Sequence, residues 1–188
     1  IALRSTDPRY FPLYVANNAF GGGGFQSRLT QEIRVKRGWS YGASSYFTHG
    51  LRRKSWSVHL YPASKDAPAA LEKTLELISD LKKTGVTPGE FSFSRNSLVN
   101  SSSFLFNTPL KRSENRVLEL LRELPEGFIR TSSDKIRAVD IRESNRNLAE
   151  FIDPDHLVIA VLCTAKDLKS KLATAAGVPE SEVVIIPY

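Results

Sequence analysis

Apolar residues recur every three or four positions along much of the chain, which is the spacing of one face of an α-helix. Capping signals support several of these segments. Ser64 precedes and Gly85 follows one of them, and Thr87 with Glu90 forms the capping box of the next. The spacing predicts helices in residues 7–20 (or from 12), 26–36, 65–84, 88–106, 109–124, 140–151 and 164–177.

Strict alternation of apolar and polar residues marks two further segments, "SYGASSYFTH" and "SWSVHLYPA". This pattern predicts an antiparallel hairpin with one solvated face and a polar turn at residues 50–54. Residues 1–3 are expected to end a strand, and the β-branched segments 154–162 and 182–188 to form two returning strands. The chain is therefore predicted to have an α+β fold, a mainly antiparallel sheet with helices packed on one face.

Composition adds limits to this picture. With 188 residues, 41% of them hydrophobic, the chain is long enough for one core, so residues 1–188 are expected to form a single domain. The net charge of +6 raises the question of nucleic-acid binding. The basic residues are dispersed, however, with no run longer than Arg52-Arg53-Lys54, so we expect no nucleic acid.

Cys163, the one cysteine, excludes a disulfide framework and is expected to be a small core residue in the buried strand segment "HLVIAVLC". No segment approaches the ~20 apolar residues of a membrane span, and no leader opens the chain, so we expect a soluble protein. Because the chain begins at Ile1 and contains no Met, we expect a fragment of a longer protein. Its compartment is not indicated.

The motifs of several enzyme classes are missing. His49, His59 and His156 are far apart, and none belongs to H-E-x-x-H or its inversion H-x-x-E-H, so no zinc site is expected in this chain. The nucleophile elbow G-x-S-x-G of many hydrolases is also missing. Candidate chemistry therefore has to come from another part of the sequence.

The stretch "FGGGGFQSRLTQEIRVKRGWSYG" is the most unusual part. Glycine inside a regular element costs about 0.5–1 kcal/mol relative to alanine, so its four consecutive glycines are expected to serve a tight geometry or a close approach. The run matches neither a P-loop nor a dinucleotide motif, which disfavours phosphate binding. A flexible hinge between two helices stays open. The aromatic and basic neighbours favour a functional loop: Phe25, Arg34, Lys36, Arg37 and Tyr41.

The ordered string "VANNAFGGGGFQSRLTQEIRVKRGWSYGASSYF", with "GVTPGEF" further along, resembles the C-terminal half-domain of the pitrilysin/insulinase family of zinc metallopeptidases. That family includes the mitochondrial processing peptidases. The resemblance implies a half-domain that binds no metal and is inactive alone. It also implies a partner, either a zinc-bearing N-terminal domain or a zinc-bearing subunit, which closes with this half over a peptide substrate. Zinc is thus expected in the partner and not in this chain.

The resemblance also implies roles for particular residues. The family's half-domain contributes an arginine at a helix end and a tyrosine at the start of the next strand, which correspond here to Arg34 and Tyr41. Tyr41 is the candidate donor to the oxyanion that forms when a zinc-bound hydroxide attacks a peptide carbonyl. Arg34 is expected to hold a substrate carbonyl or to orient Tyr41. Arg37 is the next candidate.

The glycine loop then has an expected role, because an extended peptide can approach a backbone that lacks side chains. The residues expected to bind substrate are Gly21, Gly22, Gly23, Gly24, Phe25 and Arg37. Two alternatives stay open. From the residues alone, Tyr41 is a hairpin aromatic and Arg34 a solvated helix charge. At the level of function, the alternative is that the chain is a non-catalytic structural or assembly subunit of the same fold.

Overall fold

The computed structural model of this chain describes residues 2–48 and 54–187. Its strands are β1 (Ala2–Leu3), β2 (Ser40–Phe47) and β3 (Lys54–Pro62). Its helices are α1 (Tyr10–Asn17), α2 (Arg28–Thr30), α3 (Ala67–Thr84), α4 (Pro88–Ser102), α5 (Pro109–Leu121), α6 (Ser132–Arg137), α7 (Ile141–Phe151) and α8 (Ala165–Ala176). Two π-helical turns span Asn18–Gly22 and Gln31–Val35, and 3₁₀ turns span Gly24–Gln26, Ser103–Leu105, Pro154–His156 and Glu180–Glu182.

The predicted hairpin is confirmed. β2 and β3 pair antiparallel, with Ala43 opposite Leu60 and Phe47 opposite Trp56, and the register shifts near the start of β2. β1 pairs antiparallel with the other edge of β3, which gives the strand order β1-β3-β2. The predicted turn and His49 lie outside the described residues, apart from the backbone of Lys54, which begins β3.

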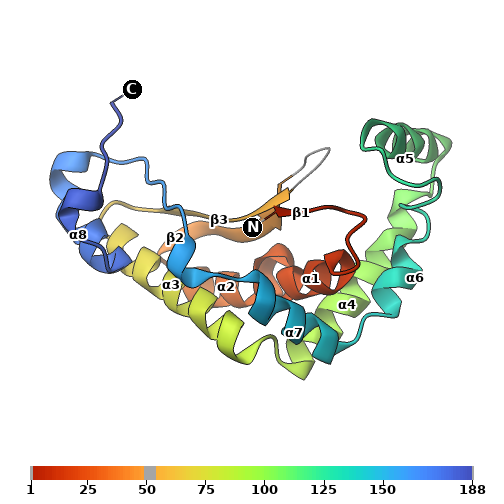
Figure 1. Ribbon diagram of the computed structural model, residues 1–188, viewed down its shortest axis with the longest axis horizontal. Helices are drawn as coiled ribbons and strands as arrows, with labels where there is room; N and C mark the ends of the chain where they lie inside the picture. The colour runs from red at the N-terminus through yellow and green to blue at the C-terminus, as the bar shows by residue number, and fades with distance from the viewer. Residues whose placement is uncertain (1, 49–53, 188) are drawn as a thin grey trace.

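The helices α1, α3 and α7 lie on one side of β2 and β3, while α5 stands apart at the end of α4 (Figure 1). The core lies between this helical layer and the sheet. Its largest fully buried side chains come from β1, α1, the π-turn that follows α1, the segment after the glycines and α3, and include Leu13, Phe20, Leu29, Ile33 and Leu81. The predicted α+β class, with an antiparallel sheet covered by helices on one face, is therefore confirmed.

Helix boundaries follow the capping signals with some differences. The Thr87 capping box is confirmed, since the Glu90 amide donates to Thr87 Oγ1 at 3.3 Å and the Thr87 amide to Glu90 Oε2 at 2.8 Å. Ser64, however, is not the cap of α3, because Asp66 occupies that position. The short helix α6 was not predicted. Across the described ranges, no helix is both long and apolar enough to span a membrane.

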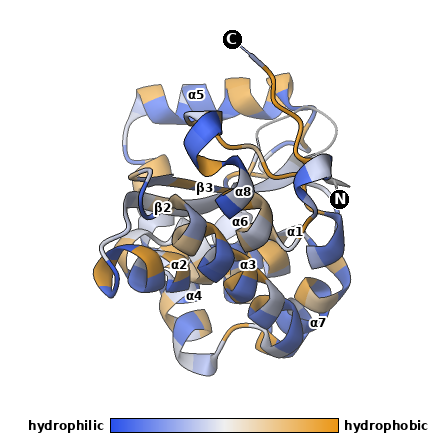
Figure 2. Ribbon diagram, turned by 90° about the vertical axis from the view of Figure 1, so that its left-hand side faces the viewer, coloured by the Kyte–Doolittle hydropathy of each residue, from blue (hydrophilic) through white to orange (hydrophobic). Residues whose placement is uncertain are grey.

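The two returning strands were predicted wrongly. Residues 157–162 and 183–187 include extended backbone, as at Leu157 (φ −92°, ψ 143°), but no other described segment pairs with them in a ladder. Val158 and Ile186 are 98% and 81% exposed, and the C-terminal tail extends away from the body with apolar residues along it (Figure 2). Cys163 is accordingly half-buried and not in the core. β-Branched residues favour extended backbone, but a strand also requires a partner.

Candidate functional site

The glycine loop packs directly against the hairpin. Gly21 is buried, and a Cβ atom built on it would lie 2.4 Å from Ser45 Oγ and 2.7 Å from the Ser45 backbone nitrogen in β2. Gly24 adopts φ +63°, a left-handed conformation that side chains disfavour, and nothing lies near its Cβ position. The run is therefore explained in part by internal contacts: Gly21 by close approach of β2, and Gly24 by the turn itself.

A buried polar network fastens this loop to the sheet. Asn17, the last residue of α1, donates through Nδ2 to the Ser45 carbonyl at 3.2 Å. Its Oδ1 accepts from Ser45 Oγ and from Trp56 Nε1, both at 2.7 Å. One side chain thus links α1 with both strands, because Ser45 lies on β2 and Trp56 on β3. This network holds the loop in place and argues against a freely moving hinge.

The helix predicted for residues 26–36 is present but irregular. Ser27 Oγ donates to the Gly24 carbonyl at 2.7 Å, and Thr30 Oγ1 donates to the Ala43 carbonyl at 2.8 Å, so the first turn is tied to β2. The backbone then widens into a π-turn over Gln31–Val35, and Gly38 ends the helix with φ +65°. π-Turns are frequent at functional sites, and this one carries Arg34.

Arg34 and Tyr41, the pair that the family resemblance implies, lie in contact. The guanidinium carbon of Arg34 is 4.2 Å from the Tyr41 ring centroid and 4.5 Å from the Phe25 ring centroid. Tyr41 is 82% exposed and Phe25 59% exposed. We call this group of Phe25, Arg34 and Tyr41 the arginine stack. Arginine over an aromatic ring is a favourable cation–π arrangement.

Arg37 is differently engaged. Its Nη1 donates to the Glu32 backbone carbonyl at 2.8 Å and to Glu32 Oε2 at 2.6 Å, and its guanidinium carbon lies 5.3 Å from the Trp39 ring centroid. Glu32 also pairs with Lys36. The hydrogen bond from Lys36 and that from Arg37 outweigh partial burial and hold the pKa of Glu32 below its ordinary value. Arg37 is therefore engaged in an ion-pair cluster at the end of the helix, where the Glu32 carboxylate pairs with both Lys36 and Arg37.

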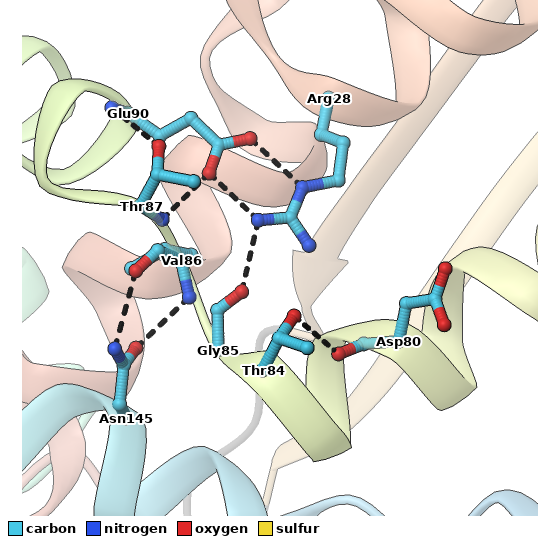
Figure 3. A network of polar contacts seen from close by, with 8 residues as sticks. All are labelled: Arg28, Asp80, Thr84, Gly85, Val86, Thr87, Glu90 and Asn145. Carbon is cyan, nitrogen blue, oxygen red and sulfur yellow. Dashed lines mark hydrogen bonds and ion pairs between the residues drawn. The ribbon is translucent and has the colours of Figure 1, made fainter.

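A clamp between the glycine-loop helix and the α3–α4 connection was not predicted (Figure 3). Arg28 donates to both Glu90 carboxylate oxygens, at 2.8 and 2.6 Å, and to the Gly85 carbonyl at 2.9 Å. Asn145 on α7 meets the same connection, accepting from the Val86 amide at 2.9 Å and donating to its carbonyl at 3.1 Å. The clamp positions the first turn after the glycines against two other helices.

The electrostatics of the clamp follow from its burial. Burial by itself raises the pKa of Glu90, but the hydrogen bonds from Arg28 and from the Thr87 amide outweigh it, so this pKa lies below its ordinary value. Only the capping box could be found from sequence, because Glu90 lies three residues after Thr87. Arg28 is 62 residues away from Glu90 along the chain, and no local signal joins them.

No metal centre is evident in the part of the chain that the structure describes. No group of three or more His, Cys, Asp or Glu side chains there could hold a metal ion. His59 Nε2 lies 2.8 Å from the Tyr46 hydroxyl, and His156 Nδ1 lies 2.8 Å from an Asp153 carboxylate oxygen. Both histidines therefore have ordinary polar partners.

Comparison with known proteins relates this chain to one family of peptidase domains. Residues 2–98 match the family model of the peptidase M16 inactive domain. A solved peptidase M16 inactive domain from Pseudomonas fluorescens is 22% identical, with a TM-score of 0.74 over 82% of this chain and 37% of that chain. The inactive peptidase domain of a proposed zinc protease from Bordetella parapertussis is 12% identical, with a TM-score of 0.67 over 79% of this chain and 80% of that chain.

A protease from Helicobacter pylori is 18% identical, with a TM-score of 0.63 over 80% of this chain and 36% of that chain. No curated protein matches by sequence. The chain thus spans little more than a third of the Pseudomonas and Helicobacter chains but most of the Bordetella domain. At these identities, the solved structures establish the shared fold.

Proposed function

This chain belongs to the peptidase M16 inactive-domain family, and from that membership we propose that it is the non-zinc half of a zinc-dependent endopeptidase. Its partner is a zinc-bearing domain of the same protein or a separate subunit. The two halves close over a peptide, and this half supplies Arg34 and Tyr41 to the carbonyl that is cleaved. The half-domain alone is inactive.

The observation that carries this proposal is the arginine stack. Residues seven positions apart, one at the end of a π-turn and one at the start of β2, lie with the guanidinium 4.2 Å from the ring centroid. Both side chains reach solvent, so a peptide has access to them. If the helix charge and the hairpin aromatic had no catalytic role, their contact would be a structural cation–π pair, and the assay below separates the two explanations.

The chemistry assigned to the pair is transition-state stabilisation. When hydroxide attacks a peptide carbonyl, the carbonyl oxygen becomes an oxyanion, and a fixed donor helps most at that moment. The Tyr41 hydroxyl is the proposed donor. Arg34 holds the ring of Tyr41 in place and presents a permanent positive charge beside it, since a guanidinium does not lose its proton in proteins. Zinc, when bound by the partner, supplies the hydroxide.

The glycine loop takes a narrower part in this proposal. Gly22 and Gly24 are exposed, so a peptide backbone can lie against them. Gly23 is half-buried, and Gly21 faces Ser45 within the fold. We therefore assign substrate contact to the exposed glycines of the loop, Gly22 and Gly24. Gly21 has a structural role, because its lack of a side chain lets the loop pack on β2.

The test is a complementation assay with a matched tyrosine control. The chain is mixed with the zinc-bearing half and zinc, and cleavage of a quenched fluorescent peptide is followed. Tyr41→Phe is expected to lower kcat by about 10²-fold or more, the scale of a lost oxyanion donor. Tyr61→Phe is the control, because Tyr61 is 71% exposed on the same hairpin and its hydroxyl has no partner in the described residues.

Three outcomes would contradict the proposal. If Tyr41→Phe and Tyr61→Phe were equally active, Tyr41 would not be an oxyanion donor. If the zinc-bearing half were fully active alone, or no combination were active, the chain would instead be a structural or assembly subunit. Activity that needs both halves and is lost only with Tyr41→Phe supports the proposed role.

A further inference from the structure

Phe25 is held in place although its ring contributes nothing to the core. The turn that carries it is pinned on both sides: Ser27 Oγ donates to the Gly24 carbonyl at 2.7 Å, and Gln31 Nε2 donates to the Phe25 carbonyl at 2.5 Å. The left-handed Gly24 sets the direction of the chain just before it. Phe25 is 59% exposed on this fixed turn, so its side chain adds little to the buried core.

What the ring touches is Arg34. The guanidinium carbon lies within 4.5 Å of the Phe25 and Tyr41 ring centroids, and among the described residues the two rings make no ring pair with each other. The arginine therefore bridges them. Because a guanidinium is planar, rings that cover its faces restrict its orientation and leave the N–H donors at its edge accessible.

Those donors have no partner among the residues that the structure describes. In the part of the chain that the structure describes, the Arg34 side chain makes no hydrogen bond and no ion pair, whereas the neighbouring Arg37 and Lys36 share the Glu32 carboxylate. Glu32 is thus already neutralised by two cations. Arg34 is held by aromatic faces alone and keeps its full hydrogen-bonding capacity for a ligand.

We propose that Phe25 is a positioning residue, whose ring holds Arg34 against Tyr41 with the guanidinium donors open toward the peptide. This inference rests on the proposed function for its consequence in catalysis, but the stack itself does not. Phe25 acts through Arg34 and does not need to touch the substrate. Removing its aromatic face lets the arginine swing away, which weakens both the held charge and the support of Tyr41.

The kinetic test is a double-mutant cycle in the complete peptidase, assembled from this chain and the zinc-bearing half. Phe25→Leu keeps an apolar side chain of similar reach but removes the π face, and is expected to lower kcat/KM about two- to five-fold, the fold-change that corresponds to an exposed cation–π contact. Phe25→Trp is expected to restore the rate, since tryptophan gives the strongest cation–π face. In an Arg34→Ala background, Phe25→Leu should cause no further loss.

The cycle separates this inference from the proposed function. An equal loss from Phe25→Leu with and without Arg34 would overturn the positioning role, since Phe25 would then act on the peptide or the fold directly. A normal rate for Phe25→Leu, with Arg34→Ala and Tyr41→Phe impaired, would overturn it as well. If Arg34→Ala and Tyr41→Phe are both fully active, the proposed function fails instead. The contact of Phe25 with Arg34 is then tested by spectroscopy alone.

That spectroscopic test uses the side-chain N–H resonances of arginine in this chain by NMR. The Arg34 Nε–H signal is expected to be shifted by the ring currents of two adjacent aromatic rings. Phe25→Leu should move this signal, leave that of Arg37 in place, and leave the thermal midpoint unchanged because the ring is mostly exposed. An Arg34 signal that does not respond to Phe25→Leu would overturn the inference without reference to activity.

Discussion

The replacement Gly21→Ala tests the main structural explanation of the glycine loop. The added Cβ would meet Ser45 Oγ at 2.4 Å, the Ser45 nitrogen at 2.7 Å and Ser45 Cβ at 2.9 Å. The side chain of Ser45 could turn away, but it would then lose its hydrogen bond to Asn17 Oδ1. The Ser45 backbone cannot move cheaply, since it lies in β2 opposite Val58 of β3.

The magnitude follows from these contacts. Overpacking of a tight site costs about 1–3 kcal/mol, and loss of the Ser45–Asn17 hydrogen bond adds about 1 kcal/mol. Replacing a helical glycine by alanine returns roughly 1 kcal/mol of propensity. We therefore expect Gly21→Ala to lower the free energy of unfolding by about 1–3 kcal/mol. Urea denaturation followed by tryptophan fluorescence measures it, since Trp56 lies in the affected network.

A matched control is available within the same chain. Gly89 lies in the first turn of α4, and a Cβ there would have no atom within 4 Å. Gly89→Ala is therefore expected to be neutral or to stabilise by up to about 1 kcal/mol. If Gly21→Ala changed the free energy of unfolding no more than Gly89→Ala does, close approach of β2 would not be the reason for glycine at position 21. A role of Gly21 in substrate contact would then be favoured.

Further predictions concern the clamp, the core and a buried carboxylate. Arg28→Ala leaves the Glu90 carboxylate without its charged partner and should cost about 1.5–3 kcal/mol in denaturation experiments, with Arg28→Lys recovering only part because lysine lacks the two-pronged geometry. Ile33→Ala empties a fully buried site and should cost about 2–5 kcal/mol by the same measurement. Burial raises the pKa of Glu119, but hydrogen bonds from the Ile129 and Gly127 amides and from Arg116 outweigh it, so its pKa lies below the ordinary 4.5. The stability it contributes is therefore present above pH 4.5 and lost as the pH falls through the lowered pKa, and Glu119→Gln should flatten that part of the unfolding profile against pH.

Much of the fold could be predicted because its signals are local. Thr87 and Glu90 are three residues apart, so the capping box is visible in the sequence, and the alternation in residues 40–49 and 55–63 predicts the hairpin from side-chain period alone. The returning strands failed for the opposite reason. Residues 157–162 and 183–187 have β-branched composition, but whether they pair depends on a strand edge elsewhere in the molecule.

The candidate site divides in the same way. Arg34 and Tyr41 were predicted from an ordered motif. They are close along the chain, so the helix end and the start of the next strand suffice to bring them into contact. Phe25 was predicted to bind substrate, which stays a prediction, and its contact with Arg34 was seen only in the structure. The Arg28 clamp was missed, because the interaction depends on how α3 and α4 return to the glycine-loop helix.

The sequence by itself determined most of the helical segments, where the hairpin lies and which motif carries the candidate chemistry, because caps, periodicity and turns act between residues close along the chain. Only the tertiary structure decided why Gly21 has no side chain, which carboxylate Arg28 meets, and which aromatic faces hold Arg34. These depend on the packing of separate elements, where a contact at 2.4 Å or a bond across 62 residues is set by three-dimensional geometry that no local pattern records.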